Sequence, residues 1–410
     1  MNYFDEYKIL RKVFADNNTL INISELGIKI NRIDFNSETR NLFVSNNFEK
    51  QNDSFFVALF KYYLSKNSFT NKYFFNSLDA TDESIQENKE FEYLLVQKED
   101  EIRSRELIIL FHGLNERSWI KYLPWAAELC KTTGKAVLLF PIAFHMDRAP
   151  VSWSNPRLMQ EVARERRSLF PNIKDNSFAN TAISIRLQYS PRRFLISGLQ
   201  TYNDVVALVK MIKEDRNSLV DKNASMDFFG YSVGGFLGEM LLMINPQNYF
   251  ANSRLFIFCG GPTFDLMAPV SKAIIDSEAD SAIRSYFTAN FPDKIYGDEI
   301  LADYFKNHKK EMDYLISFLR FENNQFLREK RLVELKDQIS IVALIKDRII
   351  PAEGISKTFL KIKDKISQIK YLNFNHSYSH ENPFPVLEKQ KNEIDSNFKE
   401  TFRLASAFYI

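Results

Sequence analysis

Four of the chain's 12 glycines lie in one short stretch, DFFGYSVGGFLGEM, which runs from Asp227 to Met240. Gly230 and Gly234 enclose Ser232, with a strand-like run before them and a helix-like run after them. A sharp turn brings a strand and a helix so close that only small residues fit beside it. The stretch therefore predicts a bend that strains the backbone of Ser232 and exposes its hydroxyl at a sheet edge. A tight turn with an unreactive serine is the plainer alternative.

Short apolar runs alternate with helical patterns along most of the chain. Strands whose hydrophobicity is continuous rather than alternating indicate a parallel sheet that helices bury on both faces. The predicted strands lie at 92–97, 106–113, 135–141, 226–230, 253–261, 339–347 and 369–375, and the predicted helices at 122–134, 201–215 and 236–244. The predicted fold class is therefore α/β.

Two long segments, 143–200 and 262–335, interrupt this alternation of predicted strands and helices, and the second has mostly helical patterns. Both follow the C-terminal ends of predicted strands, where open α/β sheets bind ligands. Connections of this length inside a compact domain tend to be functional. We expect an insertion at 143–200 and a helical cap at 262–335, with the core formed by 91–261 and 336–410.

The first part of the chain, residues 1–90, is polar and rich in Asn. Within it, 27–35 alternates like a strand, and the apolar segment 55–65 is consistent with a buried helix. We expect this region to be an N-terminal extension that packs on the core.

The stretch GYSVG at 230–234 resembles the G-x-S-x-G nucleophile elbow of the α/β-hydrolase superfamily. A second stretch, LIILFHGLNE at 107–116, is similar to the superfamily's strand followed by His-Gly. The resemblance implies an α/β-hydrolase fold, with a mostly parallel central sheet flanked by helices and a mainly helical cap made by the insertions. It also implies that Ser232 is the nucleophile and that the backbone N–H groups of Leu114 and Val233 form an oxyanion hole.

In this superfamily the acid and the histidine follow the serine in the chain. Asp347, at the end of the strand predicted at 339–347, resembles the acid, and Asp265 after the preceding strand is the alternative. The last predicted strand leads into NFNHSYSHENPFP, which holds His376 and His380. His376 sits at the strand tip, where it can simply bond the loop backbone. Loop reach favours His380 as the base, with His376 as the alternative.

Composition argues against several other classes of protein. A net charge of +2, with lysines and acids interleaved, gives no electrostatic case for nucleic acid or a membrane surface. The chain has 2 cysteines, too few for a disulfide framework, and no apolar run long enough to span a membrane. Its first residues carry acids where a signal peptide is apolar. We expect a cytoplasmic protein without a metal or cofactor; its oligomeric state cannot be read from the sequence.

The expected activity is hydrolysis of an ester, thioester or amide through an acyl-enzyme on Ser232. His380 would take the serine proton, and Asp347 would fix the tautomer of the imidazole and stabilise its positive charge. A small-molecule acyl compound, most simply a carboxylic ester, is the expected substrate. Two alternatives remain: acyl transfer to an acceptor other than water, and a binding or scaffold protein that keeps the fold without turnover.

Overall fold

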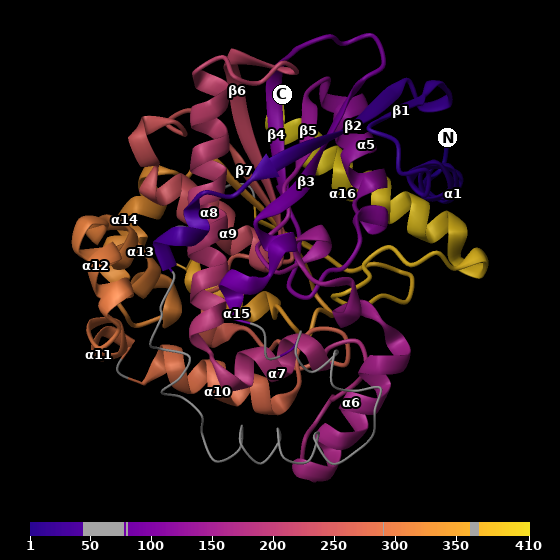
Figure 1. Cartoon of the computed structure of the whole chain (residues 1–410). Coiled ribbons are helices and arrows are strands. Elements are labelled where there is room, and N and C mark those ends of the chain that lie inside the picture. The colour runs from indigo at the N-terminus through magenta and orange to yellow at the C-terminus, as the bar shows by residue number, and fades with distance from the viewer. Residues whose placement is uncertain (44–77, 79–80, 290, 361–368) are drawn as a thin grey trace.

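The computed structural model describes residues 1–43, 78, 81–289, 291–360 and 369–410 (Figure 1). Within them, one nine-stranded sheet has the order β1-β2-β3-β5-β4-β6-β7-β8-β9. The strands are β1 (Leu20–Ile23), β2 (Ile28–Asn36), β3 (Glu90–Lys98), β4 (Ser104–Phe111), β5 (Ala136–Leu139), β6 (Val220–Tyr231), β7 (Leu255–Phe258), β8 (Ile339–Leu344) and β9 (Ile369–Leu372). Each strand predicted from a continuous apolar run is confirmed. The helix predicted at 55–65 lies outside the described residues.

The sheet is parallel from β5 through β4, β6, β7 and β8 to β9, whereas β1, β2 and β3 pair in antiparallel fashion. β2, which the alternation at 27–35 predicted, extends the sheet beyond β3, with Ile30 opposite Val96. The N-terminal region therefore contributes two strands to the same sheet. The sequence patterns did not indicate β1.

Helices cover both faces of the sheet (Figure 1). Successive residues of a strand point to opposite faces, so Ile108 and Leu110 of β4 pack in one core while Leu107 and Ile109 pack in the other. The first core is closed by α1 (Tyr3–Phe14), α5 (Leu123–Thr133) and α16 (Lys391–Tyr409), and the second by α8 (Arg192–Lys213) and α9 (Val233–Ile244). A mostly parallel sheet between two layers of helices is the predicted α/β-hydrolase fold.

The two long segments between strands are largely helical. The first holds α6 (Pro156–Leu169) and α7 (Thr181–Tyr189), and the second holds α10 (Ser277–Thr288), α11 (Phe291–Tyr296), α12 (Glu299–Asn307), α13 (Lys309–Leu319) and α14 (Gln325–Glu334). The short α15 (Ala352–Thr358) follows β8. A buried two-pronged ion pair joins the segments, because Arg166 of α6 donates to both carboxylate oxygens of Asp276 at 2.7 and 2.9 Å. In Figure 1, α6, α7 and α10 gather at one end of the sheet.

Candidate active site

The glycine-rich stretch forms a sharp connection between β6 and α9. Ser232 occupies the bend with φ 57° and ψ −123°, a left-handed φ that is strained for a residue with a side chain. A methyl group on Gly230 would lie 2.5 Å from the Cα atom of Gly235, and one on Gly234 would overlap the carbonyl oxygen of Phe111. Close approach of helix and strand therefore requires these glycines, as the sequence predicted.

Ser232, His380 and Asp347 lie together at the C-terminal edge of the sheet. The Nε2 atom of His380 lies 2.8 Å from Oγ of Ser232, and its Nδ1 atom lies 2.7 Å from Oδ2 of Asp347. The carboxylate can only accept, so Nδ1 donates to it and Nε2 is left to accept the serine hydroxyl proton. All three residues are 5% exposed, so this hydrogen-bonded chain is largely shielded from water.

The backbone around Asp347 and His380 is held from several sides. The other oxygen of Asp347 accepts from the N–H groups of Ile349 and Ile350 at 2.9 and 3.0 Å. The ring of Tyr231 stacks on His380 with centroids 5.4 Å apart, and its hydroxyl donates to the His380 carbonyl oxygen. These contacts fix the position of the imidazole without occupying its nitrogens.

One buried thiol also borders the acid. Cys259 follows β7 and is buried, and burial together with the charge of the nearby Asp347 raises the pKa of its thiol well above the ordinary range. The thiol is therefore protonated and neutral.

The alternative base and acid lie in other hydrogen-bonding environments. His376 donates from Nε2 to the carbonyl oxygen of Pro383 at 2.8 Å, and its Nδ1 accepts from the side chain of Asn397 at 2.8 Å. Both ring nitrogens are therefore engaged, one with the loop backbone and the other with a side chain of α16. Asp265 accepts from the hydroxyl of Thr263 at 2.7 Å and from the backbone N–H of Phe321.

The two backbone N–H groups expected to form an oxyanion hole flank Ser232. Val233 is the first residue of α9, so its N–H has no acceptor within the helix. Among the described residues, no acceptor is found for the N–H of Leu114. Both residues line the cavity that Ser232 faces.

The side chain of His112 ties the turn that carries Leu114 to the segment after β5. Its Nε2 accepts from the N–H of Ile142 at 2.9 Å, and its Nδ1 donates to the carbonyl oxygen of Gly113 at 2.8 Å. Burial, followed by the neighbouring His145, lowers the pKa of His112 well below its ordinary value. The ring is therefore neutral and its tautomer is fixed, as a structural turn histidine requires.

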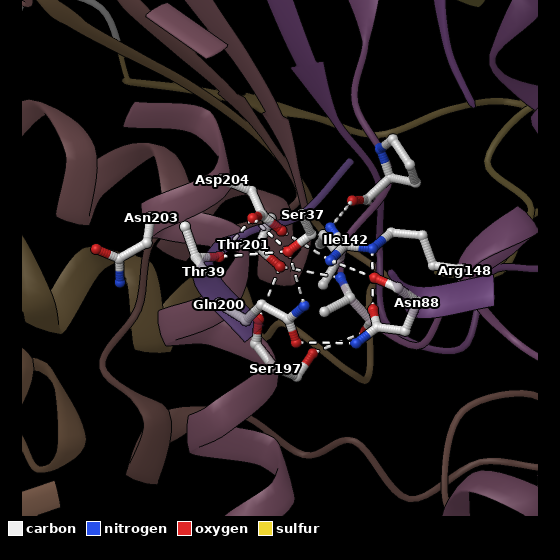
Figure 2. Close-up of polar contacts among 12 residues, drawn as sticks. Ser37, Thr39, Asn88, Ile142, Arg148, Ser197, Gln200, Thr201, Asn203 and Asp204 are labelled. Atoms are coloured by element: carbon white, nitrogen blue, oxygen red, sulfur yellow. Dashed lines mark hydrogen bonds and ion pairs between the residues drawn. The ribbon is translucent and has the colours of Figure 1, made fainter. Parts of the chain in front are cut away.

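A buried polar network holds the segment that follows β5 (Figure 2). Arg148 and Asp204 are fully buried and form an ion pair at 2.7 Å. Arg148 also donates to the carbonyl oxygen of Pro141 at 3.1 Å, and Thr201 accepts from the N–H of Ala143 at 2.9 Å. The other side chains that bond within the network are Ser37, Thr39, Asn88, Ser197 and Gln200. No sequence motif indicated this network, because its members come from four separate parts of the chain.

Neither a metal centre nor a membrane span is found in the part of the chain that the structure describes. No three His, Cys, Asp or Glu side chains there are grouped as metal ligands. None of the helices described has the length and apolar character needed to cross a bilayer.

Comparison with known proteins gives one family match. A model of DUF6051, described as a family of unknown function, matches residues 1–410. No curated protein matches the sequence.

Among solved structures, the chain is similar to several esterases. Esterase Est22 is 11% identical, with 100% of this chain and 93% of that chain covered and a TM-score of 0.46. A thermostable esterase from Pseudomonas putida is 9% identical, with 98% and 89% covered and a TM-score of 0.40. Carboxyl esterase 2 from the fungus Tuber melanosporum is 12% identical, with 76% and 81% covered and a TM-score of 0.36.

Proposed function

The chain belongs to the DUF6051 family, whose function is unknown, so its activity has to be argued from the site, and we propose that it is a serine hydrolase. The observation that carries the proposal is the hydrogen-bonded chain from the Ser232 hydroxyl through His380 to Asp347, with distances of 2.8 and 2.7 Å. This arrangement is the one that nucleophilic catalysis by a serine needs: a base within reach of the hydroxyl and an acid that orients the base.

In the proposed reaction, Ser232 attacks the acyl carbon of an ester, thioester or amide while His380 takes its proton at Nε2. Asp347 holds the proton on Nδ1 and stabilises the imidazolium that forms. His380 then returns the proton to the leaving group, which departs and leaves an acyl-enzyme on Ser232. A water molecule, activated by the same imidazole, hydrolyses the acyl-enzyme and regenerates the serine.

The negative charge that develops on the acyl oxygen needs preset donors. The N–H groups of Leu114 and Val233 meet that need, since neither has a described protein acceptor and both border the cavity at Ser232. Each such donor typically contributes about 3 kcal/mol of transition-state stabilisation. In this proposal His112 is a positioning residue, because it holds the carbonyl oxygen of Gly113 and hence the turn that presents Leu114.

The strain at Ser232 favours an enzyme over a scaffold. A residue with φ 57° and ψ −123° costs on the order of 1–3 kcal/mol, and a protein that only binds gains nothing from holding a serine in this way. A carboxylic ester is the proposed substrate class, because an alcohol leaves the tetrahedral intermediate more readily than the amine of an amide does.

The test is hydrolysis of p-nitrophenyl esters by the wild type and by Ser232→Ala, His380→Ala and His376→Ala. We expect the first two variants to lose at least about 10⁴-fold in kcat. His376→Ala, measured on its folded fraction, should stay within about tenfold of the wild type because the ring nitrogens of His376 bond Pro383 and Asn397 and neither Ser232 nor Asp347. Loss of activity in His376→Ala with full activity in His380→Ala would contradict the assignment, and inactivity of the folded wild type toward every ester and thioester tried would favour a scaffold.

A further inference from the structure

Two cavities of different size and character meet at Ser232. The larger has a volume of about 160 Å³ and is bordered by Ser232, Leu114 and Val233. The smaller, of about 80 Å³, is also bordered by Ser232 and Leu114, but on the side of His380. A substrate whose reacting carbon lies at Ser232 therefore extends one part into each cavity.

The position of His380 decides which cavity holds the acyl group and which holds the leaving group. The imidazole takes the serine proton at Nε2 and must deliver it to the leaving atom, so the leaving group lies on the His380 side. His380 lines the smaller cavity and not the larger one. The acyl group, which stays bonded to Ser232, then occupies the larger cavity.

The larger cavity suits a compact hydrocarbon group. Most of the described residues that line it are apolar, among them Leu187, Phe194, Leu237, Met240, Phe264 and Phe287. Arg186 and Arg193 at its border are engaged with Asp82. An apolar cavity of about 150 Å³ holds one benzene molecule, so about 160 Å³ accommodates an acyl chain of roughly six carbons or one aromatic ring.

The smaller cavity has a greater polar share than the larger cavity, and it is bordered by a carboxylate that forms no ion pair with a described residue. Glu381 lines it and accepts from the hydroxyl of Ser271 at 2.5 Å. Burial alone would raise the pKa of Glu381, but hydrogen bonds from Ser271, from the backbone and from Ser379 lower it, so the group is ionised. No described lysine, arginine or histidine forms an ion pair with this carboxylate, since Lys121 bonds the Glu381 carbonyl oxygen instead.

The second acid at this cavity already has a cationic partner. Glu116 accepts from Lys121 and, at 2.8 Å, from the hydroxyl of Tyr122. Of the two carboxylates, Glu381 is the one that no described cation pairs with, so it is the acceptor available to a hydroxyl group of a ligand.

We infer that the substrate is an ester of a medium-length apolar acid with a small hydroxyl-bearing alcohol, of the glycol or glycerol type. The acyl chain of about six carbons fills the larger cavity, and the free hydroxyl of the alcohol donates to Glu381 in the smaller one. This inference rests on the proposed function, in which Ser232 is the nucleophile and His380 the base.

The acyl side is tested with 2-hydroxyethyl esters of acetic, hexanoic and dodecanoic acid. We expect kcat/KM to rise by about fourfold or more per added methylene from acetate to hexanoate and not to rise further at dodecanoate. Phe287→Leu enlarges the cavity and should move the optimum to longer chains. Phe250→Leu truncates an equally buried ring that does not line the cavity, and should leave the optimum unchanged.

The alcohol side is tested with 2-hydroxyethyl hexanoate against propyl hexanoate, which has the same shape but lacks the hydroxyl. We expect the wild type to prefer the hydroxyl-bearing ester by about tenfold or more, the range for a hydrogen bond to a charged group. Glu381→Ala should hydrolyse the two esters at similar rates. General damage to the loop would lower both rates and leave the ratio as it was.

Labelling of Ser232 by a fluorophosphonate separates the two levels of the argument. If Ser232 is labelled but acetates are the best substrates, or the hydroxyl gives no advantage, the inference about the substrate is overturned and the hydrolase proposal stands. If the folded protein is not labelled and hydrolyses no ester, both fall.

Discussion

The imidazole of His380 reaches the hydroxyl of Ser232 at 2.8 Å across 148 positions of sequence. The two residues belong to connections that leave the same edge of the sheet, one after β6 and the other after β9. Parallel strands bring their C-terminal ends to one edge, so residues far apart in the chain meet there. The geometry of this pair depends on Asp347, which holds the far side of the ring.

Asp347→Asn tests that dependence. An amide in place of the carboxylate can donate to Nδ1, which favours the tautomer that carries its proton on Nε2 and cannot accept from Ser232. We expect kcat for ester hydrolysis to fall by about 10⁴-fold with little change in stability. Asp265→Asn, at the alternative acid, is the matched control and should stay within about tenfold of the wild type. The reverse order of the two variants would assign the acid to Asp265.

The bend at Ser232 predicts opposite effects for two glycine substitutions. Gly234→Ala places a methyl group against the backbone of Phe111, which cannot move without opening the sheet, so we expect a loss of about 3 kcal/mol or more in the free energy of unfolding. Gly198→Ala, inside α8, meets nothing within 4 Å and should be neutral or stabilising by up to about 1 kcal/mol. Urea denaturation followed by circular dichroism measures both, and a tolerated Gly234→Ala would contradict the close approach.

The fold was largely predictable because its central strands are continuous apolar runs. β4, β7 and β8 are buried along nearly their whole length, which leaves a clear pattern in the sequence. The antiparallel pairing of β3 with its neighbours was not predictable, because direction depends on how a strand is connected and not on its composition. The C-terminal helix α16 was also not predicted from the sequence.

The candidate catalytic residues could be predicted for a different reason: a sharp turn around a serine requires small residues, and these leave a motif. The choice between His376 and His380 depended on loop reach, which only the structure can measure. The network around Arg148 could not be predicted at all. Asp204 and Ser37, which bond within it, are 167 positions apart, so no local pattern relates them.

The buried network around Arg148 should contribute to the free energy of unfolding (Figure 2). Asp204→Ala leaves the fully buried guanidinium of Arg148 without its carboxylate, and removal of one partner from a buried ion pair typically costs about 3–5 kcal/mol. Glu400→Ala breaks a solvent-exposed pair with Arg403 inside α16 and should leave the urea midpoint unchanged. Equal midpoints for the two variants would mean that the Arg148 network does not support the fold.

A buried histidine makes the stability depend on pH. Burial, reinforced by the nearby Arg148 and Arg117, lowers the pKa of His145 from 6.5 to about 4. The unfolded chain therefore binds a proton that the folded chain does not between pH 6.5 and pH 4, so stability is full above this window and is lost as the pH falls through it.

His145→Gln removes that contribution. The loss of unfolding free energy between pH 7 and pH 5 should be smaller in the variant than in the wild type by about 2 kcal/mol. Urea titrations of both proteins at the two pH values measure the difference. An identical pH dependence of the two proteins would show that His145 is not held neutral in the fold.

The most direct test of the account is the mass of the intact protein after reaction with a fluorophosphonate. The reagent bonds only to a serine that a neighbouring base activates, so the account predicts one adduct per chain, located on the peptide that carries Ser232 and absent from Ser232→Ala. A folded wild type that takes up no adduct, or that carries it on another serine, would contradict the account.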